Sequence, residues 1–139
     1  MTHILLVGTD LPVLEGLAQS FGALGFSPVV AHSLAEGRDL AAQVPPLIAV
    51  VSRELAATSS SETLSIPLAP GGALVLYRTV GSTLVTLSPT VQRAVLADLT
   101  LPLERNRLMA LVHHVGDRAR VTGRDRSGSP TPEELLHNR

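Results

Sequence analysis

Short aliphatic runs alternate with amphipathic stretches in the N-terminal part of the chain. The runs are Ile4 to Val7, Pro28 to Ala31 and Leu47 to Val51. They do not alternate with polar residues, and such continuous runs are typical of strands covered on both faces, as in a parallel sheet. Because helix signals fill the two intervals between the runs, the pattern predicts the order β-α-β-α-β.

The first interval carries the signals of one helix. Asp10 or Thr9 supplies a capping residue, Pro12 suits the first helical turn, and Gly25 supplies a stop. The apolar residues between them recur at steps of three and four and form one stripe, made of Leu14, Leu17, Phe21 and Leu24.

The second interval predicts a helix that begins at Leu34. Ser33 and Glu36 have the spacing of a capping box, in which the serine accepts from the amide of Glu36 and the glutamate reaches back to the amide of Ser33. Pro45 and Pro46 prevent the helix from continuing. A short loop then leads into the third strand.

The signals weaken after the third strand. Between Arg53 and Gly72 the prolines and a polar run allow only a short helix near Arg53 to Ala57. Ala73 to Tyr77 is a fourth aliphatic strand. Two alternatives stay open for the next part: Ser82 to Leu87 pairs back as a hairpin strand, or Ser88 and Pro89 begin a helix. Val95 to Leu101 is then the end of that helix or a fifth strand.

The last predicted helix begins near Pro102 or Leu103 and carries an apolar stripe of Leu108, Leu111, Val112 and Val115. We expect it to fray between Gly116 and Val121. This divides the chain into a domain of residues 1–121 and a flexible tail of residues 122–139, rich in Arg, Ser, Gly and Pro. Thr131 to Leu136 can form at most one capped turn.

Composition removes several kinds of chemistry. The 139 residues include no cysteine and no tryptophan, and all 11 basic residues are arginine. The chain therefore has no thiolate nucleophile, no cysteine-ligated zinc, no Schiff-base lysine and no lysine general base. No paired carboxylates or metal-ligand set stand out, so we expect a protein that is not an enzyme and uses no cofactor.

Charge and hydropathy give further expectations. The formal net charge is −1, which gives no long-range field for nucleic acid, and 2% aromatic residues leave few rings for stacking on bases. The arginines near the C-terminus are interleaved with Asp117 and Asp125, which is typical of a solvated segment. No aliphatic run approaches the roughly 20 residues of a membrane helix, and we expect a cytoplasmic protein.

The predicted order of elements over about residues 3–116 resembles the receiver domain of response regulators in two-component signalling. The resemblance implies an α/β fold of the flavodoxin-like type. Its doubly wound, mostly parallel five-stranded sheet has helices on both faces, with a degenerate region where the third and fourth helices lie. The spacing of Ile4 to Val7, Leu47 to Val51 and Ala73 to Tyr77 carries the resemblance more than any signature residue does.

The resemblance also assigns a pocket, at which this chain departs from the family. Receivers end their first strand in an acidic pair that holds Mg²⁺, their third in the Asp that accepts a phosphoryl group, their fourth in Thr or Ser, and their fifth in Lys-Pro. The corresponding positions here form a degenerate pocket of Gly8, Thr9, Asp10, Ser52, Tyr77 and Leu101. The acidic pair, the phosphoacceptor and the lysine are all missing, and the ring of Tyr77 is expected to fill the vacated space.

These departures predict a degenerate pseudo-receiver, which regulates by binding another signalling protein or a second copy of itself, without phosphorylation. Receivers usually make such contacts through the surface formed by their fourth helix, fifth strand and fifth helix. The candidate interaction face is therefore Val91, Val95, Leu99, Leu103, Arg107 and Leu111. An alternative of another class is a small-molecule or nucleotide sensor, with its ligand at the carboxyl ends of the strands.

Overall fold

The computed structural model describes residues 2–81, 85–101 and 103–127, with no side chain described beyond Arg118. Five strands form one sheet in the order β2-β1-β3-β4-β5, and every neighbouring pair is parallel. The strands are β1 (His3–Val7), β2 (Ser27–Ala31), β3 (Ile48–Ser52), β4 (Ala73–Thr79) and β5 (Val95–Leu101). The predicted α/β fold and its fifth strand are confirmed.

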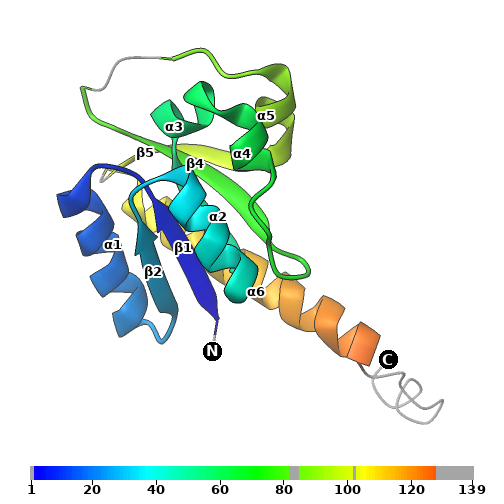
Figure 1. The fold of residues 1–139 in the computed structure, drawn as a ribbon. Helices are drawn as coiled ribbons and strands as arrows, with labels where there is room; N and C mark the ends of the chain where they lie inside the picture. Colours follow the sequence, from blue (N-terminus) through cyan, green and yellow to red (C-terminus); the bar gives the residue numbers. More distant parts are fainter. Residues whose placement is uncertain (1, 82–84, 102, 128–139) are drawn as a thin grey trace, which may run out of the picture.

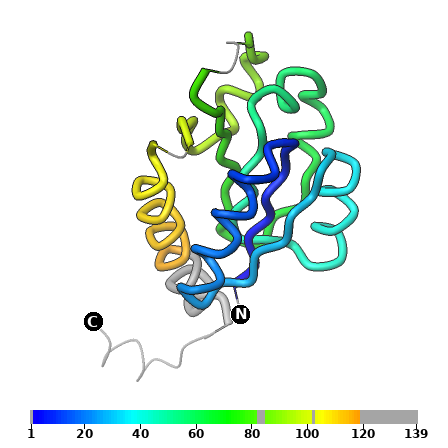
Figure 2. Tube along the Cα trace, turned by 90° about the vertical axis from the view of Figure 1, so that its left-hand side faces the viewer, coloured from blue at the N-terminus to red at the C-terminus, as the bar shows by residue number. Residues whose placement is uncertain are grey.

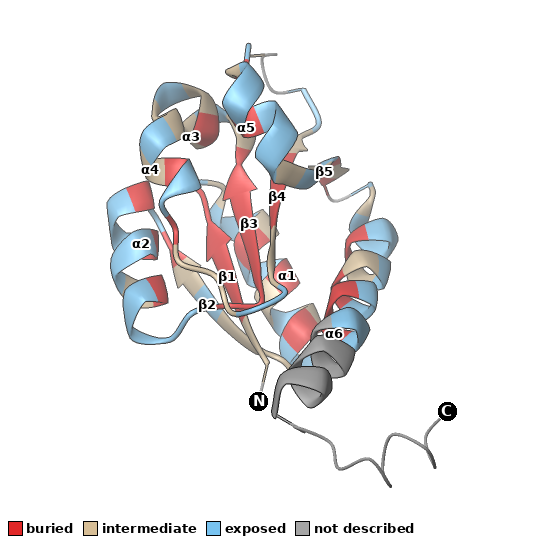
Figure 3. Cartoon of the chain, turned by 90° about the vertical axis from the view of Figure 1, so that its right-hand side faces the viewer, coloured by how far each residue is buried: buried red, intermediate tan, exposed pale blue. Residues whose placement is uncertain are grey.

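Helices cover both faces of this sheet (Figures 1 and 3). They are α1 (Leu11–Ala23), α2 (Leu34–Gln43), α3 (Arg53–Thr58), α4 (Ser60–Leu64), α5 (Pro89–Ala94) and α6 (Arg105–Ser127). The core on one face joins the stripes of α1 and α6 to the sheet, and the core on the other joins α2, α3 and α5 to it. Alternate residues along the central strands point into these two cores.

The helix ends differ from the sequence predictions in detail. Asp10 occupies the capping position of α1, but its side chain makes no capping hydrogen bond. At α2, the amide of Glu36 donates to Ser33 Oγ as predicted, whereas the Glu36 carboxylate accepts from the amide of His32. The glutamate therefore caps the residue before Ser33, because the chain turns there from β2 into the helix.

The structure decides between the hairpin strand and the helix predicted after β4, and it adds one helix that was not predicted. Ser88 caps α5 by accepting from the amide of Val91, so the helix prediction is confirmed; residues 85–88 form no strand, and residues 82–84 lie outside the described part. α4 was not predicted, because its sequence is polar. Ser59 Oγ donates to Glu62 there, and the hydroxyl of the buried Thr63 donates to the carbonyl of Ser59.

The predicted limits of the last helix are wrong at both ends. α6 begins at Arg105, because the amide of Glu104 donates to the carbonyl of Thr100 and the Glu104 carboxylate accepts from the amide of Thr100. It continues to Ser127, past the stretch where fraying is predicted. The predicted tail therefore begins inside α6, and its remaining residues, 128–139, lie outside the described part with the turn predicted there. Among the described residues no helix is long and apolar enough to span a bilayer.

Candidate functional site

The residues of the predicted pocket meet where the strands end. All strands are parallel, so their carboxyl ends lie at one edge of the sheet. Ser52 is paired with Tyr77, Tyr77 with Leu99, and Thr79 with Leu101. Gly8 follows β1 directly, and its amide donates to the carbonyl of Ala31 at 3.1 Å. This is the edge at which open α/β sheets bind ligands.

Tyr77 fills the space above Gly8. Its side chain is fully buried and belongs to the core under α1 and α6. A Cβ atom added at Gly8 would overlap the Tyr77 hydroxyl oxygen and would lie 3.1 Å from its Cζ and 3.5 Å from Cβ of Ser52. The phenol ring therefore leaves no room for any side chain at position 8, and position 8 is where a receiver carries a carboxylate.

The buried hydroxyl of Tyr77 has an unusual environment. It makes no hydrogen bond to any described atom of the protein. Burial raises the pKa of Tyr77 well above its ordinary value, and the negative charges of Asp10 and Glu54 raise it further. The phenol therefore stays neutral, since the charged form would lose its solvation and face two carboxylates.

The remaining pocket residues offer little chemistry. Ser52 is buried at the end of β3, Thr9 is exposed, and Asp10 is half-buried at the start of α1. The side chain of Ser52 makes no capping hydrogen bond at the start of α3. The described residues include no cluster of His, Asp and Glu suited to a metal ion. Leu101 is fully buried and packs in the same core as Tyr77.

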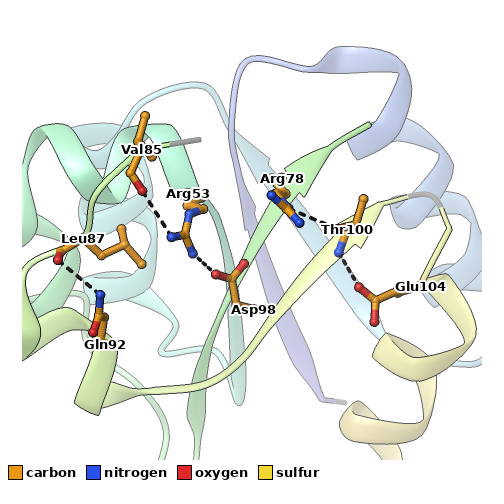
Figure 4. A network of polar contacts seen from close by, with 8 residues as sticks. All are labelled: Arg53, Arg78, Val85, Leu87, Gln92, Asp98, Thr100 and Glu104. Carbon is orange, nitrogen blue, oxygen red and sulfur yellow. Dashed lines mark hydrogen bonds and ion pairs between the residues drawn. The ribbon is translucent and has the colours of Figure 1, made fainter. Parts of the chain in front are cut away.

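Arg53 is a residue of this edge that the sequence analysis missed. It follows Ser52 directly, and its guanidinium pairs with the carboxylate of Asp98 on β5 (Figure 4). Its Nη2 also donates to the carbonyl of Val85 at 3.2 Å. The side chain is only 19% exposed, and that of Asp98 34%. Arg53 thus ties the end of β3 to β5 and to the segment that precedes α5.

A second set of polar contacts lies beside it on β5 (Figure 4). Arg78 Nε donates to Thr100 Oγ1 at 3.1 Å, and the amide of Thr100 donates to Glu104 at 2.8 Å. Arg107 pairs with the other carboxylate oxygen of Glu104 at 3.0 Å. The hydrogen bond from Thr100, then that from Arg107, lower the pKa of Glu104.

The candidate interaction face needs correction at two positions. Val91 and Leu99 are fully buried, because each points into a core under the helices, so neither contributes to a surface. Val95 and Leu111 are partly exposed, and Arg107 is exposed. Leu103 is 76% exposed, the highest value among the large hydrophobic residues that the structure describes.

Among known proteins, similarity is found to solved structures and not to sequences. No family model and no curated protein matches the sequence. A response regulator receiver domain protein from Clostridium thermocellum matches with a TM-score of 0.66 and 12% identity, over 88% of this chain and 99% of that chain.

Other matches are of the same kind. A two-component response regulator from Clostridium difficile has a TM-score of 0.66 and 17% identity, over 85% of this chain and 98% of that chain. A CheY-like receiver domain protein from Methanospirillum hungatei has a TM-score of 0.63 and 18% identity, over 84% and 95%. The chain therefore has the fold of these receiver domains. Identities this low show the fold and not the activity.

Proposed function

We propose that this chain is a non-catalytic signalling module that uses the receiver fold without phosphorylation and regulates through contact with another protein or a second copy of itself. The observation that carries the proposal is the position of Tyr77 over Gly8 and beside Ser52. The ring occupies the space beside Gly8 in which, by the resemblance, a receiver carries a carboxylate that holds Mg²⁺.

The chemistry of the edge supports the same proposal. An acyl phosphate needs a carboxylate nucleophile, and Ser52 offers a hydroxyl without a base. Mg²⁺ prefers several hard oxygen ligands, and Asp10 is the carboxylate nearest in sequence to the first strand's end. With Leu101 in place of the family's lysine, the last residue of β5 is apolar and cannot make the contact to a phosphoryl group that the lysine makes in that family.

The contacts of Arg53 suggest how the module keeps one conformation. Arg53 bonds to Asp98 and to the carbonyl of Val85, and these contacts join β3, β5 and the segment before α5 without any phosphoryl group. The arrangement of β5 and the segment before α5 is therefore built into the chain. The degenerate pocket and the contacts of Arg53 therefore both support a module that works without phosphorylation.

The alternative of a small-molecule or nucleotide sensor receives less support. Tyr77 and Leu101 are fully buried where a ligand would enter from the ends of the strands. A thermal-shift screen with nucleotides and acyl phosphates separates the two functions, because a ligand that binds the folded state raises its melting temperature. We expect no shift, and a reproducible shift that Tyr77→Ala alters would favour the sensor.

The experiment that tests the proposed function is partner capture with the full chain. The chain is immobilised and exposed to extract with and without acetyl phosphate and Mg²⁺, beside Ser52→Ala. We expect the same bound proteins, or the same self-association, in every arm. Binding that requires acetyl phosphate, or that Ser52→Ala abolishes, would contradict a phosphorylation-independent module.

A further inference from the structure

A cavity lies between the start of β5 and α6, away from the carboxyl ends of the strands. α1 and α6 lie side by side on one face of the sheet (Figure 2). His113 of α6 contacts Phe26, which follows α1, whereas the next residue of α6 lines the cavity. The cavity has a volume of about 360 Å³, more than twice the roughly 150 Å³ that holds benzene. Its wall combines apolar and cationic side chains, among them Ala73, Leu96, His114, Val115 and Arg118.

Leu96 reaches this cavity because β5 contains an irregularity. Val95 pairs with Leu74 and Ala97 with Val75, so Leu96 is an additional residue between two paired positions. Such a bulge at the edge of a sheet re-aims a side chain. Leu96 is 47% exposed, so a hydrophobic side chain is left partly open to solvent beside the cavity.

Two of the lining side chains favour an anionic partner. Arg118 is exposed and carries a permanent positive charge, and His114, four residues earlier on α6, adds an N–H donor on the same side of the helix. The described residues that line the cavity include no carboxylate, and Asp117, next to Arg118 in sequence, is not one of them. A segment that fits this surface therefore needs carboxylates beside apolar side chains.

The chain itself contains such a segment at residues 131–136. Thr131 and Glu134 have the spacing of a capping box, and Pro132 between them suits a first helical turn. Glu133 adds a second carboxylate, and two leucines follow directly. A single capped turn is marginal alone, so packing of these leucines on a surface would stabilise it.

The segment is close enough along the chain to return to the cavity. α6 continues from Arg118 to Ser127, about 14 Å of helix, and projects beyond the sheet (Figure 1). The chain from Ser127 to Glu133 spans up to about 20 Å when extended, which covers that distance. A tethered segment has an effective concentration in the millimolar range, which gives it an advantage over a free acidic protein of equal affinity.

We infer that residues 131–136 of this chain dock in the cavity between β5 and α6, with their carboxylates toward His114 and Arg118 and their leucines against Leu96. In the docked form the chain covers a surface that would otherwise bind acidic and apolar segments of other proteins. The inference goes beyond the proposed function, because it concerns the start of β5, whereas the degenerate pocket lies at the carboxyl ends of the strands.

The test is disulfide trapping in the full chain, which has no cysteine of its own. Leu96→Cys and Leu135→Cys are introduced together, and disulfide formation under mild oxidation is followed by non-reducing electrophoresis and mass spectrometry. Leu11→Cys with Leu135→Cys is the matched control, because Leu11 is exposed to a similar extent, 44%, and lies at the start of α1, at the opposite end of the strands. We expect the first pair to close within one chain about tenfold faster than the control pair, or more.

Charge reversal separates docking from chance encounter. Arg118→Glu should slow closure of the first pair and leave the control pair unchanged, and Glu133→Arg with Glu134→Arg should restore the rate in the Arg118→Glu background. Circular dichroism melts of each variant verify that the fold is kept. Equal rates for the two cysteine pairs, or no effect of Arg118→Glu, would overturn the inference.

Disulfides that form mainly between two chains, even on dilution, would assign the cavity to the segment of a second copy and would also overturn it. Each of these results leaves the proposed function standing, because that function fails only if phosphorylation controls binding.

Discussion

The hydroxyl of Tyr77 lies where the side chain of any residue at position 8 would begin. Gly8 is therefore a requirement of this packing, since any side chain there would overlap the Tyr77 hydroxyl. The two positions lie about seventy residues apart in sequence and meet only because β1 and β4 flank β3 in the sheet. Because of this fit, a carboxylate side chain at position 8 would also require a change at Tyr77.

Gly8→Ala is expected to destabilise the fold by about 1–3 kcal/mol, because its methyl group must displace the Tyr77 ring. Tyr77→Phe removes the overlapping oxygen and a buried hydroxyl without a hydrogen bond, so it should be neutral or stabilising. In the Tyr77→Phe background, Gly8→Ala should cost less, since the remaining contact is to Cζ at 3.1 Å. Urea unfolding of the four proteins measures this coupling; additive effects would contradict the packing described.

The titration of Tyr77 gives a second prediction. Because burial and the nearby carboxylates raise its pKa in the folded state, the unfolded chain loses the phenol proton first as pH rises. Its contribution to stability is thus fully present below the ordinary tyrosine pKa of about 10 and declines above it. Tyr77 is the sole tyrosine and the chain has no tryptophan, so ultraviolet absorbance reports this group alone.

We expect tyrosinate absorbance to appear together with unfolding at alkaline pH, rather than before it. Tyr77→Phe should show a smaller loss of stability in the same pH range. Tyrosinate formation near the ordinary pKa in a chain that stays folded by circular dichroism would show that the hydroxyl is accessible to solvent.

The contact between Arg53 and Asp98 should hold the segment before α5. Arg53→Gln and Asp98→Asn are each expected to lower stability by about 1–2 kcal/mol, as the pair is only partly exposed. Hydrogen exchange should speed up around Val85 to Leu87 in both variants. The double variant should resemble either single one, and Arg38→Gln, on the exposed side of α2, is the control. If hydrogen exchange around Val85 to Leu87 were unchanged in Arg53→Gln, the proposal that Arg53 holds this segment would be contradicted.

Glu104 should link the start of α6 to pH. Its pKa is lowered in the folded state by the hydrogen bonds from Thr100 and Arg107. The stabilisation is therefore present above the ordinary glutamate pKa and is lost as pH falls below it. In thermal melts from neutral to acidic pH, the melting temperature of Glu104→Gln should fall less steeply with pH than that of the unmodified chain. Parallel curves for the two proteins would contradict a stabilising role of the Glu104 hydrogen bonds.

Local sequence patterns were sufficient to predict the first three strands and the helix α1. The continuous aliphatic runs and the stripe of Leu14, Leu17 and Phe21 predicted β1 to β3 and α1, because burial imposes these periods directly. α4 was missed because its stabilising contacts are hydrogen bonds of Ser59 and Thr63, which look in sequence like a polar loop.

The candidate site shows the limit of such signals more clearly. The strand-end positions of Gly8, Ser52 and Tyr77 could be predicted, since parallel strands bring their ends to one edge. The role of Arg53 could not, because its partners lie 45 and 32 residues away and no motif marks them. Val91 and Leu99 were assigned to a surface by the resemblance to receivers. The register of β5, which includes an irregularity near its start, turns Leu99 into one core, and the packing of α5 turns Val91 into the other.

The central claim is that Tyr77 and the missing acidic groups leave this receiver fold unable to accept a phosphoryl group. Intact-mass spectrometry of the full chain after incubation with acetyl phosphate and Mg²⁺ tests it most directly, with a receiver that retains its Asp as the positive control. The account predicts no Mg²⁺-dependent phosphoryl adduct on this chain while the control is labelled. A Mg²⁺-dependent adduct that maps to this edge of the sheet, at Ser52 or Asp10, would contradict it.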